Sequence, residues 1–131
     1  MSNSNHVPNT VLVVEDEPAI AVVCSRVLKG EGWKVEVAVN GLEAQDLIDK
    51  QPYTLLIVDM RTPEMNGEQF YQYISEHHPQ LVKHIIFTTG NLLDDNMRSF
   101  LESSGRLFLS KPFTTDELRG VVRQAMEMLK K

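Results

Sequence analysis

The sequence is poor in cysteine, in clustered basic residues and in long apolar runs, and each shortage excludes a class of protein. Its single cysteine, Cys24, allows neither an internal disulfide nor a zinc site built on paired cysteines, and it favours a reducing, cytoplasmic compartment. The 13 Lys and Arg residues are outnumbered by 18 Asp and Glu residues and form no basic block, so direct nucleic-acid binding is not expected. No apolar run approaches the roughly 20 residues that span a bilayer, so no membrane segment is expected.

The remaining pattern predicts one α/β domain behind a short tail. The N-terminal residues Met1 to His6 are polar, so we expect a flexible tail at 1–9 and a single domain at 10–131. Short β-branched runs then alternate with helical periodicity five times, which predicts a parallel sheet with helices on both faces. The expected strands are 10–14, 34–39, 54–58, 84–88 and 106–109. The first helix is expected to bury one stripe, formed by Ile20, Val23, Cys24, Val27 and Leu28.

Charged residues stand where three of these strands end. The acidic tripeptide Glu15-Asp16-Glu17 follows the first strand, Asp59 follows the third and Lys111 follows the fifth. Because the carboxyl ends of parallel strands lie along one edge of a sheet, we expect carboxylates and an ammonium group to share one pocket there. Such carboxylates need a cation, and oxygen ligands that also accept phosphate favour Mg²⁺. A carboxylate beside Mg²⁺ can attack a phosphoryl group in line, with Asp59 as nucleophile and Lys111 as counter-charge.

Further motifs accompany these charged residues. In chain order the set is Glu15-Asp16, Asp59, Pro63, Met65, Gly67, Thr88-Thr89-Gly90, Phe108 and Lys111-Pro112-Phe113. With these motifs, the chain from about Thr10 to Leu129 resembles the receiver domain of response regulators in two-component signalling. The resemblance implies a doubly wound, flavodoxin-like α/β fold: a five-stranded parallel sheet in the order 2-1-3-4-5 with five flanking helices. It also implies a cis peptide bond before Pro112.

The same resemblance assigns the chemistry of the pocket. Asp59 would accept a phosphoryl group from phosphohistidine, with Lys111 paired to the phosphate. Mg²⁺ would be held by Asp16, Asp59 and the backbone carbonyl of Arg61, with Glu15 acting through water. Such transfer is self-directed, with slow autodephosphorylation, so the resemblance implies a signalling module and not an enzyme.

The resemblance further implies a conformational switch. Thr89 would donate its hydroxyl to the new phosphate, and Phe108 would turn inward to fill the space left behind. The surface of the fourth helix, fifth strand and fifth helix would then change for an output partner that the sequence does not identify. Arg61 and Asn91 flank the path of water to the phosphate and would set its lifetime, with Arg61 lying over the phosphoryl group to slow its hydrolysis.

The implied phosphoryl donor is a histidine kinase or a histidine phosphotransfer domain, acting on a monomer or a phosphorylation-dependent dimer. Two other interpretations stay open: a receiver-fold interaction module whose acceptor is not used, and an aspartyl-phosphate phosphatase similar to the haloacid dehalogenases. The phosphatase needs a second aspartate two residues after its nucleophile, where this chain has Arg61. The sequence also fits either a stand-alone regulator or a receiver from a longer hybrid histidine kinase.

Overall fold

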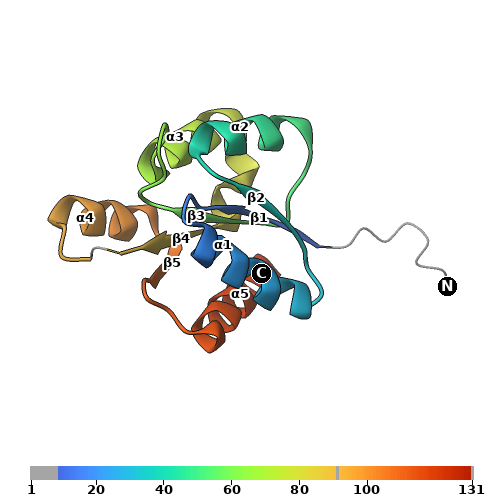
Figure 1. The fold of residues 1–131 in the computed structure, drawn as a ribbon. Coiled ribbons are helices and arrows are strands. Elements are labelled where there is room, and N and C mark those ends of the chain that lie inside the picture. The colour runs from blue at the N-terminus through green and yellow to red at the C-terminus, as the bar shows by residue number, and fades with distance from the viewer. Residues whose placement is uncertain (1–8, 91, 131) are drawn as a thin grey trace.

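The computed structural model describes residues 9–90 and 92–130, in which strands and helices alternate along the chain (Figure 1). The expected N-terminal tail lies, apart from Asn9, outside the described residues. The strands are β1 (Thr10–Val14), β2 (Lys34–Ala38), β3 (Leu55–Asp59), β4 (Ile85–Thr89) and β5 (Leu107–Ser110). The helices are α1 (Pro18–Gly30), α2 (Gly41–Lys50), α3 (Gly67–His77), the 3-10 helix η1 (Pro79–His84), α4 (Asp95–Ser104) and α5 (Thr115–Leu129). Within the described residues, no helix is both long and apolar enough to cross a membrane.

The five strands are parallel and lie in the order β2-β1-β3-β4-β5, so the expected doubly wound sheet is confirmed. The strands β3, β4 and β5 each end one residue later than expected, at Asp59, Thr89 and Ser110. Asp59 is therefore the last residue of β3, where it is paired in register with Thr88 of β4. This places the expected acceptor at the carboxyl edge of the sheet, on its central strand.

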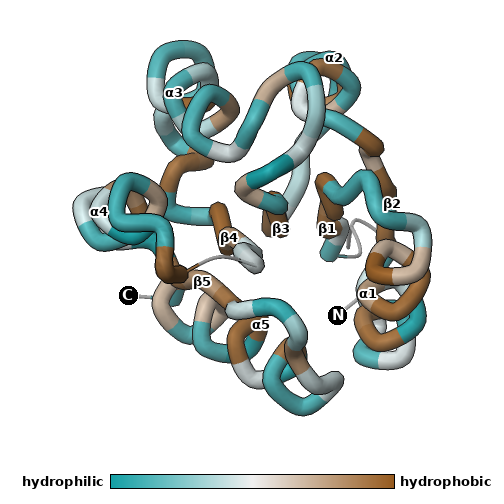
Figure 2. The backbone as a smooth tube through the Cα atoms, turned by 60° about the vertical axis from the view of Figure 1, so that its left-hand side comes forward, coloured by the Kyte–Doolittle hydropathy of each residue, from teal (hydrophilic) through white to brown (hydrophobic). Residues whose placement is uncertain are grey.

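Alternation along the strands divides the core between the two faces of the sheet. On β1, Leu12 and Val14 belong to the cluster that contains Phe70 of α3, while Val11 and Val13 belong to the cluster that contains Leu118 of α5. Figure 2 shows α2 and α3 on one side of the strands and α1 and α5 on the other. The strands β1, β3 and β4 are buried on both faces, which accounts for their nearly continuous apolar runs.

Helix α1 buries most of the expected stripe, with Ile20 partly buried against the core, but Ala21 takes the place of Val23. Its buried residues are Ala21, Cys24, Val27 and Leu28, whereas Val23 keeps 42% of its surface exposed, so the prediction for Val23 was wrong. The sequence offered apolar residues at two overlapping helical spacings, and only the packing against the sheet selects one of them. Val23 therefore lies on the surface, beside Lys111, Pro112 and Phe113.

Helix α4 lies at the β4–β5 end of the sheet (Figure 1) and is anchored by the three residues expected from the sequence. Leu101 is fully buried, and Met97 and Phe100 are partly buried against the same cluster. The ring centroid of Phe100 lies 5.6 Å from that of Phe87 and 5.3 Å from that of Tyr71, both in edge-type arrangements. Such pairs add to the burial of apolar area and fix α4 against β4 and α3.

The first residue of α3, Gly67, closely approaches Met60, the residue that follows β3. Its backbone N–H donates to the Met60 carbonyl at 3.1 Å, and a Cβ at Gly67 would lie 2.7 Å from Met60 Sδ and 2.8 Å from Met60 Cα. A capping box between Asn66 and Gln69 fixes the start of the same helix. Glycine at 67 thus allows α3 to brace the residue that directly follows Asp59.

We predict that Gly67→Ala destabilises the fold by about 1–3 kcal/mol, because the added methyl group meets backbone and side chain of Met60. Gly120→Ala is the matched control: a Cβ there meets nothing within 4 Å in the exposed middle of α5, so it should stabilise by about 0.5–1 kcal/mol. Urea unfolding of the two variants measures both effects. Equal effects of the two substitutions would contradict the close-approach argument.

Candidate functional site

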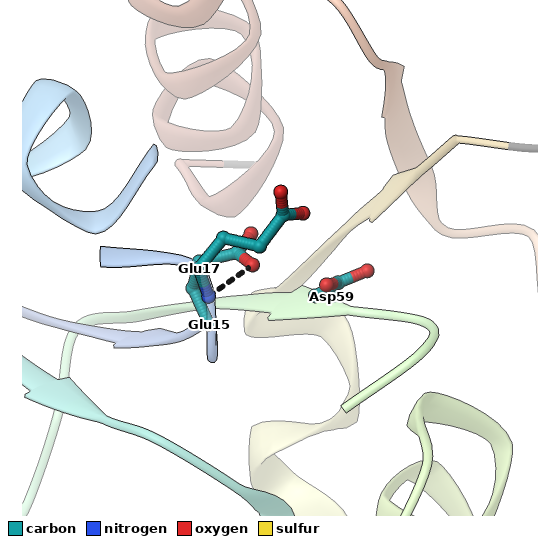
Figure 3. A group of neighbouring side chains, drawn as sticks. All are labelled: Glu15, Glu17 and Asp59. Carbon is teal, nitrogen blue, oxygen red and sulfur yellow. Dashed lines mark hydrogen bonds between the residues drawn. The ribbon is translucent and has the colours of Figure 1, made fainter. Parts of the chain in front are cut away.

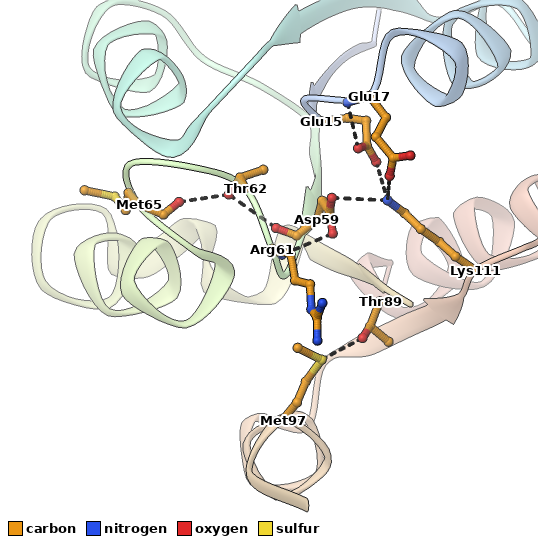
Figure 4. Close-up of polar contacts among 9 residues, drawn as sticks. All are labelled: Glu15, Glu17, Asp59, Arg61, Thr62, Met65, Thr89, Met97 and Lys111. Carbon is orange, nitrogen blue, oxygen red and sulfur yellow. Dashed lines mark hydrogen bonds and ion pairs between the residues drawn. The ribbon is translucent and has the colours of Figure 1, made fainter. Parts of the chain in front are cut away.

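Lys111 is the centre of the polar cluster at the carboxyl edge of the sheet. Its Nζ lies 2.9 Å from Glu15 Oε1, 3.1 Å from Asp59 Oδ2 and 3.2 Å from Glu17 Oε1 (Figure 4). The Lys111 side chain is only 13% exposed, so these contacts are shielded from water on most sides. The sequence predicted that Asp59, Lys111 and the pair Glu15-Asp16 would lie together. Of that pair, Glu15 is in contact with Lys111.

Main-chain hydrogen bonds place these residues where their strands end. The Lys111 N–H donates to the Thr89 carbonyl at 2.7 Å, which holds the segment after β5 against the end of β4. The Glu15 N–H donates to the Ala38 carbonyl at 2.9 Å, which does the same for β1 and β2. The peptide bond between Lys111 and Pro112 is cis, as the sequence motif implied.

Three carboxylates gather at this edge, and one of them was not assigned from the sequence. Ligand oxygens of Glu15, Glu17 and Asp59 all lie within 4.8 Å of one another (Figure 3). Glu15 and Asp59 are buried, whereas the Glu17 side chain is 61% exposed. Glu17 completes the acidic tripeptide noted in the sequence, and that third acidic residue was the available signal. Asp16, which was assigned to the metal, is exposed and not in this group, so its role stays a prediction.

Burial and neighbouring charges shift both partners of the central ion pair. Burial raises the pKa of Glu15 above its ordinary value of 4.5; the hydrogen bond from Lys111 opposes this, and the negative charge of Asp59 adds to it. Burial alone would lower the pKa of Lys111, but the hydrogen bond to Glu15 and the charge of Asp59 raise it above its ordinary value. Lys111 thus stays a cation, while the ionised form of Glu15 is disfavoured by the fold.

The loop after β3 orients the Asp59 carboxylate. Asp59 Oδ1 accepts from the Arg61 N–H at 3.1 Å, so both carboxylate oxygens have a partner. The Thr62 hydroxyl is buried and donates to the Met65 carbonyl at 2.8 Å, which closes the loop. Figure 4 shows the Arg61 side chain extending from this loop toward Thr89 and Met97. The proposed roles of the Arg61 side chain and carbonyl stay predictions.

The two expected switch residues differ in exposure. Thr89 is fully buried, and its hydroxyl donates to Met97 Sδ of α4 at 2.7 Å (Figure 4). Phe108 of β5 is 40% exposed and so points at least partly outward. The contact with Met97 was not expected, because eight positions separate the two residues and no motif connects them. Asn91, expected to influence phosphate lifetime, lies outside the described residues.

We predict that Glu15→Gln is more stable than the wild type at neutral pH without divalent cations. Because the fold raises the pKa of Glu15, its contribution to stability is full below about pH 4.5 and is lost as the pH rises through the folded-state pKa. Glutamine copies the neutral form at every pH. Urea unfolding in chelator from pH 4 to pH 8 measures the difference, which should grow with pH; a constant difference would contradict this assignment.

Comparisons with known proteins identify the family of the chain. A family model described as the response regulator receiver domain matches residues 11–123. Sporulation initiation phosphotransferase F of Bacillus subtilis (strain 168) is 27% identical over 118 residues, which cover 90% of this chain and 94% of that protein. Response regulator Rre1 of Synechocystis sp. is 31% identical over 120 residues, with coverage of 91% and 52%. Rre1 and several other curated relatives are longer, and the chain spans 12% to 54% of their length.

Solved structures agree as well. The signal receiver domain of a signal transduction histidine kinase from Syntrophus aciditrophicus superposes with a TM-score of 0.83 at 26% identity, covering 94% of this chain and 93% of that chain. Chemotaxis response regulator CheY4 of Vibrio cholerae superposes with a TM-score of 0.81 at 25% identity, covering 91% and 99%. Family model, relatives and structures thus agree on one assignment. The chain belongs to the response regulator receiver domain family.

Proposed function

We propose that the chain is a phospho-acceptor that takes a phosphoryl group from phosphohistidine onto Asp59 and transmits the change to its surface. The observation that carries the proposal is the setting of Asp59: a buried carboxylate at the end of the central strand, with Lys111 Nζ 3.1 Å from one oxygen. A carboxylate so placed is oriented for attack, and a cation is in position to balance the charge of an incoming phosphoryl group.

We propose Mg²⁺ as the cofactor. Three carboxylates share the cluster with one ammonium group, which leaves a formal charge of −2, and all the donor atoms are hard oxygens. The residues that fit this cation are Glu15, Glu17 and Asp59, joined by Asp16 and the Arg61 carbonyl as the family resemblance implies. When bound, Mg²⁺ would neutralise charge on the phosphoryl oxygens.

Each residue of the site has its own role in this phosphoryl transfer. One oxygen of Asp59 forms the new O–P bond while the P–N bond of phosphohistidine breaks, and the leaving imidazole keeps the electron pair. Lys111 balances charge on the transferred oxygens, and Thr89 donates its hydroxyl to one of them. Inward rotation of Phe108 would follow and alter the surface of α4, β5 and α5, which is where we place the output partner.

The donor we propose is a histidine kinase or a histidine phosphotransfer domain. Relatives of the chain include a sensor kinase, CckA of Brucella abortus, and a phosphotransferase, which supports a place in such a relay. Ala19, Ile20 and Val23 of α1 line a hollow of about 230 Å³ together with Pro112, Phe113 and Lys111, the residue that contacts Asp59. An apolar hollow at this place suits a docking helix. A cytoplasmic location and a monomer or phosphorylation-dependent dimer stay predictions.

The proposal is tested by incubating the chain with Mg²⁺ and acetyl phosphate, and separately with a phosphohistidine protein, followed by mass spectrometry. We expect one added phosphoryl group with either donor, lost in Asp59→Asn and in chelator, because the nucleophile and its cation are then removed. Asp46→Asn, an exposed carboxylate on α2, is the matched control and should be phosphorylated normally. Adduct without sustained phosphate release identifies an acceptor; rapid turnover supports the phosphatase, and no adduct supports the interaction module.

The same adduct tests the proposed role of Arg61. After removal of the donor, the wild type should lose phosphate slowly, whereas Arg61→Asn should lose it faster because the large cation no longer covers the phosphoryl group. An unchanged rate of phosphate loss would contradict the proposed role of Arg61, but not the role of Asp59 as the acceptor.

A further inference from the structure

A side-chain hydrogen bond connects the site to α4. The Thr89 hydroxyl, at the end of β4, donates to Met97 Sδ at 2.7 Å, and the two side chains point toward one another in Figure 4. Met97 lies in the first turn of α4, where its backbone N–H donates to the Asp94 side chain at 3.0 Å as part of the helix cap. The orientation of the Thr89 hydroxyl is therefore linked to the position of the first turn of α4.

The hydroxyl proton of Thr89 cannot be shared fully between Met97 and a second acceptor. Thr89 has one hydroxyl proton, so it donates one full hydrogen bond at a time. A thioether sulfur is a weak neutral acceptor, whereas a phosphoryl oxygen is charged and forms hydrogen bonds about twice as strong as neutral ones. A phosphoryl group on Asp59 would thus outcompete Met97 for the proton of Thr89.

We propose, on the basis of the phospho-acceptor function above, that Met97 is a positioning residue that holds Thr89 in its unphosphorylated orientation. Phosphorylation of Asp59 moves the hydrogen bond of Thr89 from Met97 Sδ to a phosphoryl oxygen. The first turn of α4 then loses a contact with β4, while Leu101 and the ring contacts of Phe100 keep the next turn packed. The start of α4 is consequently the part of the helix that responds first to the phosphate.

The test removes the sulfur atom that accepts the hydrogen bond and keeps a side chain of similar volume. Met97→Leu keeps an apolar side chain of similar size but has no sulfur, so the hydrogen bond from Thr89 to residue 97 is lost. With acetyl phosphate and Mg²⁺, we expect Met97→Leu to take up the phosphoryl group about two- to tenfold faster than the wild type, the range set by a net hydrogen bond. Met126→Leu, a partly buried methionine of α5, is the matched control and should leave the rate unchanged.

A double-mutant cycle separates the hydrogen bond from packing. In a Thr89→Val background the hydroxyl is gone, so Met97→Leu should have no further effect on the rate. Amide NMR shifts of unphosphorylated Met97→Leu should also move at residues 95–98 toward those of the phosphorylated wild type. Equal acceleration in both backgrounds, or none in either, would overturn the role of Met97. Failure of the wild type itself to form an adduct would overturn the phospho-acceptor function instead, together with the role that rests on it.

Discussion

The structure of the site depends on one interaction, the contact of Lys111 Nζ with three carboxylates. Lys111 comes from the segment after β5, Glu15 and Glu17 from the segment after β1, and Asp59 from the end of β3, so the ion pairs join distant parts of the sheet. Removing Lys111 would leave the buried carboxylates of Glu15 and Asp59 without a counter-charge, which is costly. One ammonium group does not balance three carboxylates, so the cluster that organises this edge of the sheet also favours the binding of a cation.

Much of the fold followed from periodicity. Alternating β-branched runs and helical stripes predicted five parallel strands between two layers of helices, and residues such as Leu12, Phe70 and Leu118 occupy the two resulting cores. The strand order needed the family resemblance, because the sequence pattern alone does not say which strands are neighbours. The exposure of Val23 was not predicted either, since α1 offers two overlapping apolar spacings and tertiary packing selects between them.

Some residues of the site could likewise be predicted from the sequence, and others could not. Asp59, Glu15 and Lys111 were predictable because parallel strands bring their ends to one edge. Glu17 was visible as an acidic residue, but only its side-chain direction places it beside Asp59. The contact of Thr89 with Met97 was out of reach, because it depends on how the first turn of α4 lies against β4. Motifs thus indicate the proposed acceptor Asp59 and its counter-charge Lys111, while the contact between Thr89 and Met97 is set by packing.

The most direct test of the central claim, that Asp59 and its neighbours form a cation-dependent acceptor pocket, is a calorimetric titration of the unphosphorylated chain with Mg²⁺. The account predicts one bound ion per chain, with an affinity about tenfold or more lower in Asp59→Asn, because that carboxylate is central to the cluster. Binding should persist in Asp46→Asn. No detectable binding by the wild type, or equal affinity in Asp59→Asn, would contradict the account.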